Sequence, residues 1–531
     1  APLTLSFARQ KDIICHVFPD ERSAAFVALG IAQSTGHTVA LVCTSGTATL
    51  NFAPAIAEAY YSHVPLLILT ADRPPEWIDQ QDGQTIRQEN IYGRHVKASY
   101  TLPVDTSHEE ARWHLNRSVN EAINNCMILP MGPVHVNVPL REPLYLLDKE
   151  PLTPFTIIRR SNPEYTLLEE KREELQKRWA GFNKTLIVPG QGIMSPSLQE
   201  SLKSLMEAEK AVVVADIISN AGKHGDIIRH HDLFLGQIED TAREALRPDL
   251  LITFGRSVVS KNLKLFLRNF PPMEHWHVQA AGEAADPFKT LTDIIPCAPD
   301  YFFKQLSPTN VLGDYAANWK KAENLTTEYE KGFFEDIVFG EFFAVKSIMK
   351  ELPGNAVLHF GNSMPIRYGN FINAHEAEEV FCNRGTSGIE GVNSTVTGHA
   401  IANAKVNYLI TGDTSFLYDR NAFWTREVPE NLKIIVLNNR GGGIFRMIEG
   451  PASQPELEDY FEVRHAHTAE PTAREFGFNY YQTEGPNTFP DVLRAFIQDP
   501  LRSILEVFSE SKVNASLFSN YKKGLYHVLN K

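Results

Sequence analysis

Short apolar runs alternate with helix-length stretches along almost the whole chain of 531 residues. Runs such as 39–43, 185–190 and 434–437 are rich in Val, Ile and Leu. Buried strands of parallel sheets read as continuous apolar runs, and the stretches between them supply the crossover helices. The alternation therefore predicts an α/β fold built from mainly parallel sheets.

The predicted strands fall into three consecutive blocks. Residues 139–154 lose periodicity and gain prolines, and a polar, helix-prone stretch at 300–334 leads out of the second block. We therefore expect three α/β domains, at 1–150, 151–335 and 336–531. The strands expected in them are 39–43, 65–69, 133–138, 185–190, 211–215, 249–255, 275–279, 356–360, 380–382, 408–411, 434–437 and 503–507.

Composition limits the partners of the chain. Asp and Glu number 64 against 51 Lys and Arg, and no Lys/Arg-rich run is present, so non-specific nucleic-acid binding is not expected. We also see no signal peptide and no apolar segment long enough to span a bilayer. Five scattered cysteines without metal-like spacing are expected to be reduced thiols of a cytoplasmic protein. They are Cys15, Cys43 and Cys382, which lie in strand-like apolar runs, and Cys126 and Cys297.

Two predicted strands end in residues that suit a metal ion and a phosphate. The run 408–411 leads into Gly412, Asp413, Thr414 and Ser415, and the run 434–437 leads into Asn438-Asn439-Arg440-Gly441. An Asp and an Asn at the carboxyl ends of two buried strands can meet in space. Hard oxygen ligands suit Mg²⁺ or Mn²⁺, and glycines let the backbone approach a phosphate. Either piece alone is also an ordinary turn signal.

The pair of segments resembles the binding motif for thiamine diphosphate (ThDP), a Gly-Asp followed by Asn-Asn. The third position of that motif is usually Gly and is Thr414 here, whose hydroxyl can donate to a phosphate. ThDP chemistry also needs a carboxylate beside the aminopyrimidine ring, and we assign it to Glu21 in preference to Asp20. The segment Thr44-Ser45-Gly46, between a strand and a helix, offers amides and hydroxyls to the cofactor.

Basic side chains cluster where predicted strands end, at Arg73, Arg87, Lys261, Arg367 and Arg384. The carboxyl ends of parallel strands are where ligands bind in open α/β sheets, and arginine binds carboxylates bidentately. A single such residue is more often a surface charge. Several together indicate a substrate with more than one carboxylate.

Five longer segments (44–48, 70–76, 361–363, 383–389 and 438–442) together resemble the MenD family. These are ThDP-dependent transferases of menaquinone biosynthesis that decarboxylate 2-oxoglutarate and add the product to isochorismate. The resemblance implies a pyrimidine-binding domain, a central domain and a diphosphate-binding domain. It also implies a homodimer or homotetramer, since the cofactor lies between the first domain of one subunit and the last domain of another.

The resemblance carries over residue roles. It implies Glu21 as the activating glutamate, a metal ion held by Asp413, Asn439 and the carbonyl of Gly441, and Ile389 as the support of the bent cofactor. The cofactor set is completed by Thr44, Ser45, Gly46, Ser363, Gly412, Thr414, Ser415 and Ile444. The implied substrate pocket consists of Arg73, Gln84, Lys261, Ser363, Arg367, Arg384, Ile444, Phe445 and Ile448.

Two departures and two alternatives accompany this interpretation. The family has a Gly-Ser-Arg turn just before the position of Ala1, so we expect the first domain to lack its N-terminal edge, and it has Asn where Gly83 stands.

One alternative is another ThDP-dependent decarboxylase or carboligase, of the kind that carries FAD; the glycine pattern at 188–192 is weak support for a dinucleotide. The other is a catalytically inactive α/β scaffold protein.

Overall fold

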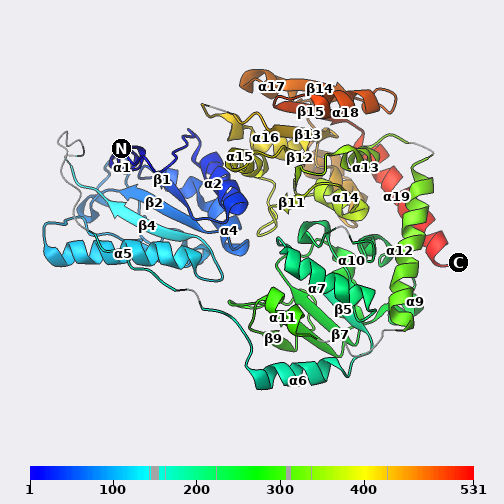
Figure 1. The fold of residues 1–531 in the computed structure, drawn as a ribbon. Coiled ribbons are helices and arrows are strands. Elements are labelled where there is room, and N and C mark those ends of the chain that lie inside the picture. Colours follow the sequence, from blue (N-terminus) through cyan, green and yellow to red (C-terminus); the bar gives the residue numbers. More distant parts are fainter. Residues whose placement is uncertain are drawn as a thin grey trace.

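The computed structural model describes residues 1–142, 144, 155–161, 163–222, 224–306, 313–335, 338–426 and 428–531. Three separate sheets, all of them parallel, follow one another along the chain, and helices cover them (Figure 1). The α/β fold predicted from the alternation of apolar runs is confirmed. The expected domain boundaries fall at or beside residues 145–154 and 336–337, which lie outside the described residues.

The first sheet, with its helices, forms the N-terminal unit. Its strand order is β1-β2-β4-β3. The strands are β1 (Val39–Cys43), β2 (Leu66–Asp72), β3 (Ser99–Thr101) and β4 (Val134–Pro139). The helices are α1 (Pro2–Ala8), α2 (Glu21–Thr35), α3 (Ala48–Asn51), α4 (Ala53–Tyr61) and α5 (Glu109–Met127), with short turns of helix at Pro75–Trp77 and Gly93–His95.

The central unit carries the sheet β6-β5-β7-β8-β9. Its strands are β5 (Thr185–Pro189), β6 (Val212–Val213), β7 (Leu250–Phe254), β8 (Glu274–Val278) and β9 (Asp293–Ile295). The helices are α6 (Glu169–Trp179), α7 (Pro196–Glu207), α8 (His231–Phe234), α9 (Asp240–Leu246), α10 (Lys261–Asn269), α11 (Pro299–Gln305) and α12 (Asp314–Phe333), with a short turn at Ile217–Ser219.

The C-terminal unit carries the largest sheet, in the order β11-β10-β12-β13-β15-β14. Its strands are β10 (Val357–Phe360), β11 (Glu379–Cys382), β12 (Asn407–Gly412), β13 (Leu432–Asn438), β14 (Asn479–Thr483) and β15 (Ser503–Phe508). The helices are α13 (Glu341–Glu351), α14 (Met364–Ile372), α15 (Val392–Ala402), α16 (Asp413–Tyr418), α17 (Glu470–Phe476), α18 (Phe489–Gln498) and α19 (Ser511–Leu529), with short helices at Arg420–Phe423, Gly443–Met447, Pro451–Ser453 and Leu457–Glu462.

Two strand expectations need correction. The apolar run 13–18 around Cys15 is not a strand: Cys15 is exposed, and the side chain of Ile14 is 86% exposed, because no neighbouring strand pairs with this segment among the described residues. The expected strand 211–215 is paired only at Val212–Val213, followed by a single bridge from Val214 to Ile228. The chain turns after this short strand to make its polar contacts with the C-terminal unit.

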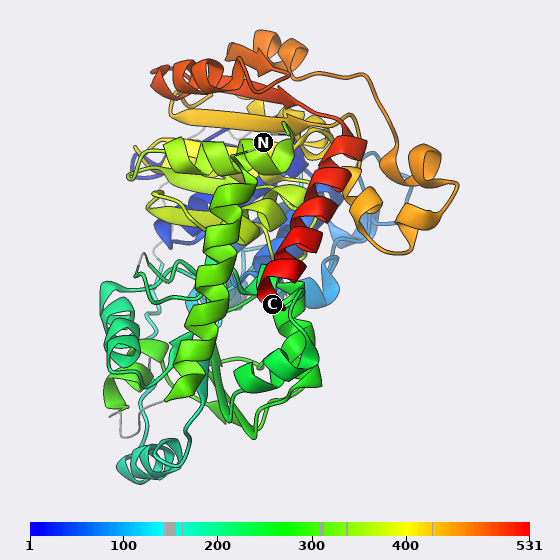
Figure 2. The ribbon, with the colours of Figure 1, turned by 90° about the vertical axis from the view of Figure 1, so that its right-hand side faces the viewer.

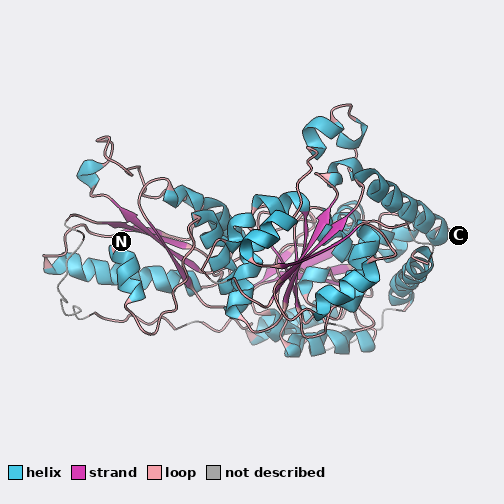
Figure 3. Cartoon of the chain, turned by 90° about the horizontal axis from the view of Figure 1, so that it is seen from above, coloured by secondary structure: helices cyan, strands magenta, loops and turns pink. Residues whose placement is uncertain are grey.

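The N-terminal and C-terminal units meet through two helices in close contact, α2 and α15. A Cβ added to Gly30 would lie 2.0 Å from the carbonyl oxygen of Thr395, and one added to Gly398 would lie 2.1 Å from that of Val27. Two glycines therefore allow the backbones to touch at the crossing, where any side chain would force the helices apart. Figure 3 shows the N-terminal unit to one side of the other two.

The central and C-terminal units are joined by a shared apolar core. Ile218 and Val259 of the central unit pack in one cluster with Phe342 and Tyr368 of the C-terminal unit. The long helices α12 and α19 run side by side along this junction (Figure 2), with the rings of Tyr329 and Tyr521 5.2 Å apart. Among the described residues, no helix combines the length and the apolar character needed to cross a bilayer.

Candidate active site

Asp413 and Asn439 follow two adjacent strands of the C-terminal sheet. Because β12 and β13 are parallel neighbours, the residues after them emerge at the same edge of the sheet. The two strand ends are joined directly, since the backbone N–H of Gly441 donates to Asp413 Oδ2 at 2.9 Å. The geometry thus confirms that the two strand ends meet, while their role toward a metal ion stays a prediction.

The side chain of Asn439 is held in one orientation. Its Nδ2 donates to Oε1 of Glu341 at 2.6 Å. Its Oδ1 is shielded from solvent, and no hydrogen-bond partner for it lies in the described part of the chain. Burial raises the pKa of Glu341 to about 7, and the carboxylate of Asp413 adds to that rise. A shielded carbonyl oxygen beside a carboxylate is a donor pair that suits a hard cation.

A cavity of about 420 Å³ opens beside these strand ends. Ser363 stands on its wall with a backbone φ of 76°, a left-handed conformation that is uncommon for a residue other than glycine and that often marks functional sites. Of the predicted site residues, those that line the cavity are Ser363, Ile389, Gly412, Asp413, Thr414, Ser415, Asn439, Gly441, Ile444 and Phe445. Ile448 follows the short helix that carries Ile444 and does not line it.

The glycine at 441 is required by close packing. A Cβ at this position would lie 2.5 Å from the carbonyl oxygen of Glu462, so only glycine lets the chain pass between that carbonyl and Asp413. The ring of His465 closes the same corner, with its Nε2 3.4 Å from Asp413 Oδ2. The close approach of the Asp413 carboxylate raises the pKa of His465. The carboxylate of Asp413 is therefore enclosed by donors on the protein side and open toward the cavity.

Glu21 is the first residue of α2, and its neighbour Asp20 is the N-cap of that helix. The carboxylate of Asp20 accepts the N–H of Arg22 at 2.9 Å and the amide of Asn421 at 2.8 Å, so it is already occupied. Glu21 accepts only a long bond, 3.3 Å, from Asn51 among the hydrogen bonds of the described residues. The capping role thus falls to Asp20 and leaves Glu21 available.

The other predicted residues of the N-terminal unit gather at the carboxyl edge of its sheet. The backbone of Gly46, in the Thr44–Ser45–Gly46 turn, approaches Gln84 so closely that an added Cβ would be 3.2 Å from the Cα of Gln84. Arg73 follows the neighbouring strand β2. Neither this group nor Glu21 lines the 420 Å³ cavity of the same chain, whose described lining residues all lie between 341 and 465. Within one chain, the two predicted halves of the cofactor site are therefore separate.

Arg384 lies in a loop that is held from two sides. Its Nη1 donates to Oδ1 of Asn362 at 3.0 Å, and the Nδ2 of Asn362 donates back to two carbonyls of the loop at 2.7 Å each. From the N-terminal unit, the buried carboxylate of Glu58 accepts the N–H of Gly385 at 2.8 Å and that of Thr386 at 2.7 Å. The position of Arg384 is thus fixed by residues of both units.

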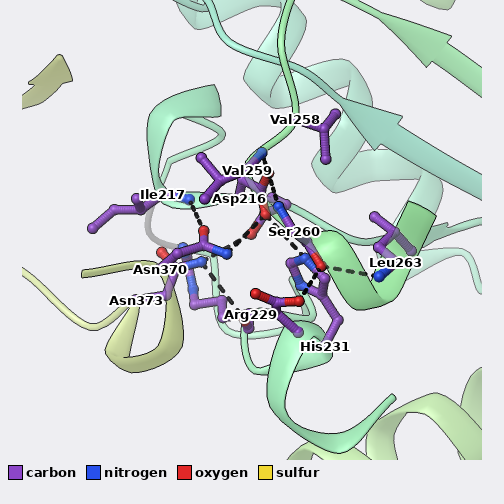
Figure 4. Close-up of polar contacts among 12 residues, drawn as sticks. Asp216, Ile217, Arg229, His231, Val258, Val259, Ser260, Leu263, Asn370 and Asn373 are labelled. Atoms are coloured by element: carbon purple, nitrogen blue, oxygen red, sulfur yellow. Dashed lines mark hydrogen bonds and ion pairs between the residues drawn. The ribbon is translucent and has the colours of Figure 1, made fainter. Parts of the chain in front are cut away.

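The elements that carry Lys261 and Arg367 meet at Asp216 (Figure 4). This buried carboxylate accepts the backbone N–H of Ser260, next to Lys261, at 3.2 Å, and the side-chain amide of Asn370, one turn along α14 from Arg367, at 3.0 Å. Burial lowers the pKa of Arg367, and the charge of Arg384 lowers it further. Two cations held near each other in a partly buried place favour an anionic ligand.

Two family models match this chain, one in the N-terminal unit and one mainly in the central unit. Residues 1–91 match the model of the thiamine pyrophosphate enzyme N-terminal TPP binding domain, and residues 160–360 match that of the middle domain of thiamine pyrophosphate enzymes. A protein of Cytophaga hutchinsonii is 40% identical over 99% of this chain and 94% of its own length, and one of Flavobacterium johnsoniae is 38% identical with the same coverage. A third, from Bacteroides thetaiotaomicron, is 36% identical over 100% of this chain and 94% of its own. All three are named 2-succinyl-5-enolpyruvyl-6-hydroxy-3-cyclohexene-1-carboxylate synthase.

The chain belongs to this synthase family. The resemblance inferred from the five sequence segments is confirmed, and with it the assignment as a ThDP-dependent transferase, a carboligase of menaquinone biosynthesis. The site fits the cofactor that the family uses: the orphaned Oδ1 of Asn439 and the carboxylate of Asp413 suit a divalent cation, and a Cβ added at Gly412 would meet nothing within 4 Å, which leaves open space for a diphosphate. Among the described residues, no group of three or more His, Cys, Asp or Glu side chains is placed to hold a metal ion.

Sequence reasoning missed two cavity residues of this synthase. Glu341 is nearly 100 residues before Asn439, and an acid at the start of a helix reads as a helix-dipole partner. His465 lies in a polar segment without strand or helix periodicity. The sequence alone offered no signal for either contact, because both depend on the three-dimensional approach to Asp413 and Asn439.

Proposed function

We propose that the chain decarboxylates 2-oxoglutarate and adds the remaining four-carbon unit to isochorismate, as a cytoplasmic enzyme with domains 1–150, 151–335 and 336–531. The names of the relatives support this choice, since a succinyl group on a cyclohexene carboxylate is what those two substrates would give. The observation that carries the proposal is the pairing of Asp413 with Asn439: both line a cavity of about 420 Å³, and Asn439 Oδ1 has no hydrogen-bond partner among the described residues.

The metal ion is Mg²⁺ or Mn²⁺, and Asp413, Asn439 and the carbonyl of Gly441 would hold it. Gly412, Thr414 and Ser415 lie at the start of α16 and would face the diphosphate. When bound, ThDP supplies the electron sink that lets a 2-oxo acid lose CO₂. Ile389, which is 39% exposed on the cavity wall, would give the cofactor an apolar support.

A second copy of the chain supplies the other half of the site. In one chain Glu21 and the Thr44–Ser45–Gly46 turn lie away from the cavity, which supports a homodimer or homotetramer in which these residues reach the cofactor of a partner subunit. Glu21 would then bind the aminopyrimidine ring and hold a proton on it. The availability of its carboxylate, in contrast to that of Asp20, supports this role.

Substrate carboxylates are bound by basic and polar side chains at the carboxyl ends of strands. Arg367 and Arg384 lie close enough to repel each other, and an anion relieves that repulsion. Lys261 projects from the first turn of α10 in the adjoining unit. Arg73, Gln84 and Ser363 would add further contacts. Ile444 and Phe445, which line the cavity, would form an apolar wall that keeps water from the reacting carbon, and Ile448, just outside that lining, would extend it.

The proposal is tested by assaying the purified protein with ThDP, Mg²⁺, 2-oxoglutarate and isochorismate, leaving out one component at a time. Asp413→Ala should abolish Mg²⁺-dependent ThDP binding, measured by calorimetry, because it removes the only side-chain carboxylate of the proposed metal shell. Glu21→Gln should bind ThDP as the wild type does and lose turnover. Mg²⁺-dependent ThDP binding that persists in Asp413→Ala would contradict the proposed metal site. Full turnover in Glu21→Gln would contradict the proposed role of Glu21.

Mixing these two inactive variants tests whether the site is shared between chains. A mixed dimer of one Glu21→Gln chain and one Asp413→Ala chain contains one site with both native residues. Random exchange should therefore restore about a quarter of the wild-type activity in a two-fold dimer. No restoration after verified subunit exchange would show that each site is built within a single chain.

A further inference from the structure

The two neighbouring asparagines at the end of β13 are held in different ways. Each donates its Nδ2 to a buried carboxylate at 2.6 Å, Asn438 to Glu506 and Asn439 to Glu341. The Oδ1 of Asn438 is used inside the protein, since it accepts the N–H of Arg440 at 3.0 Å. The Oδ1 of Asn439 is shielded from solvent and accepts no hydrogen bond from the described residues. Of the two, only Asn439 therefore has a side-chain carbonyl oxygen without a hydrogen-bond partner among the described residues.

Glu341 is placed firmly enough to fix that orientation. It is the first residue of α13, 1% exposed, and its backbone N–H donates to Oδ1 of Asn514 at 3.0 Å. Asn514 belongs to α19 and is itself bound to Ser509 at 2.9 Å. The carboxylate thus reaches Asn439 from a helix packed against the C-terminal helix of the chain, and not from the loop that carries the asparagine.

In its ionised form the Glu341 side chain accepts hydrogen bonds and donates none, so it then takes only the Nδ2 end of the amide. The Oδ1 end is then turned away from Glu341, in a residue that lines the same cavity as Asp413. A hydrogen bond from a ligating group to a carboxylate also makes the ligand atom a better electron donor, and such outer contacts change metal affinity by about 10–100-fold.

We propose that Glu341 is a positioning residue for the metal site: it orients the amide of Asn439 so that Oδ1, and not Nδ2, faces the cation. This inference rests on the proposed role of Asn439 as a metal ligand. It adds a residue that lines the same cavity and acts through Asn439, and it explains why the second asparagine of the pair, and not the first, supplies the ligand.

The test measures the Mg²⁺ concentration that gives half-maximal ThDP binding, by calorimetry at saturating ThDP, so that turnover does not enter. Glu341→Ala should raise this concentration by about 10–100-fold. For Glu341→Gln, this Mg²⁺ concentration should lie between the values for Glu341→Ala and the wild type. The amide oxygen of the new Gln can still accept from Asn439 Nδ2, but when the Gln amide is turned round its nitrogen faces Asn439 and favours the wrong orientation of that side chain. If Glu341→Ala does not fold, which its melting curve without ligands would reveal, Glu341→Gln alone carries the test, with at least a threefold increase expected.

Glu506→Gln is the matched control. It alters a buried carboxylate that holds the neighbouring asparagine at the same distance, so it should lower stability comparably. Its Mg²⁺ half-saturation should stay within about twofold of the wild type, as for independent sites. An equal loss of Mg²⁺ affinity in Glu506→Gln and Glu341→Gln would overturn the proposal in favour of a general structural effect.

A double-mutant cycle separates positioning from direct ligation. If Glu341 acts through Asn439, then adding Glu341→Ala to Asn439→Ala should cause no further loss of Mg²⁺ affinity. An additive loss would make Glu341 a ligand in its own right and overturn the inference. Wild-type Mg²⁺ affinity in Asn439→Ala would overturn both the inference and the proposed metal site, whereas a loss in Asn439→Ala with none in Glu341→Ala would overturn the inference alone.

Discussion

Glu58 offers a sharp test of how the loop that carries Arg384 is held. Its buried carboxylate accepts the N–H of Gly385 at 2.8 Å on one oxygen and the N–H of Thr386 at 2.7 Å on the other. Glu58→Gln keeps the size of the side chain but replaces one oxygen with an NH₂ group. Whichever way the new amide turns, one loop N–H faces a donor and loses its bond.

The magnitude follows from the lost contact. A hydrogen bond to a charged group contributes about 1.5–3 kcal/mol, and a value of about 2 kcal/mol corresponds to an equilibrium change of roughly 30-fold. Amide hydrogen exchange at Gly385 and Thr386, followed by mass spectrometry, should therefore become about 30-fold faster at one of the two positions. The exchange of core amides in β12 should not change, because the opening is local.

Ser62→Ala is the control for this prediction. The hydroxyl of Ser62 donates to the same carboxylate at 2.7 Å but does not belong to the loop. Its removal should leave exchange at Gly385 and Thr386 near the wild-type rate. If Glu58→Gln exchanged no faster than Ser62→Ala, Glu58 would not be holding the loop that carries Arg384.

Two further predictions concern substrate binding and pH. Arg384→Lys should raise the KM for 2-oxoglutarate by about tenfold or more, with ThDP binding unchanged, because lysine cannot bind a carboxylate bidentately; weaker ThDP binding with an unchanged KM would instead make Arg384 a structural partner of Asn362. Burial lowers the pKa of His230, but Glu323 and Glu330 outweigh this effect and raise it to about 10, so the stabilisation from this pairing is complete below about pH 6.5 and is lost as the pH rises toward 10. The melting temperature of the wild type should accordingly fall more steeply over this window than that of His230→Gln, and parallel slopes would contradict the assignment.

The sequence predicted correctly the placement of residues that directly follow apolar strands. Runs of apolar residues located β12 and β13, and parallel pairing then placed Asp413 and Asn439 at one edge, as the structure confirms. Strands with mixed or polar composition escaped the pattern, such as β3 at Ser99–Thr101 and β14 at Asn479–Thr483. Residues 13–18 show the opposite error, because apolar composition cannot reveal whether a neighbouring strand is present to pair with.

The site could be predicted only in part, for a related reason. Residues such as Ser363, Ile389 and Ile444 came from the family resemblance, and the cavity brings them together. Glu341 and Glu58 could not be found, since each approaches its partner from a helix far away in sequence, and a lone Glu on a helix carries no sign of the loop it will contact. Contacts of that kind become visible only when the packing of helices is known.

The crossing of α2 and α15 has a mechanical consequence. Glu21 begins α2, and the amide of Asn393 on α15 donates to the carbonyl of Phe416 at 2.9 Å in the helix that Asp413 begins. With Gly30 and Gly398 at the crossing, no compressible side chain separates the two helix backbones there. In a dimer whose sites each draw Glu21 from one subunit and Asp413 from the other, the Glu21 and Asp413 of one chain would serve two different sites. The direct contact of α2 and α15 would then link these two sites within one polypeptide, so that a shift of α2 at one site would move α15 and α16 at the other.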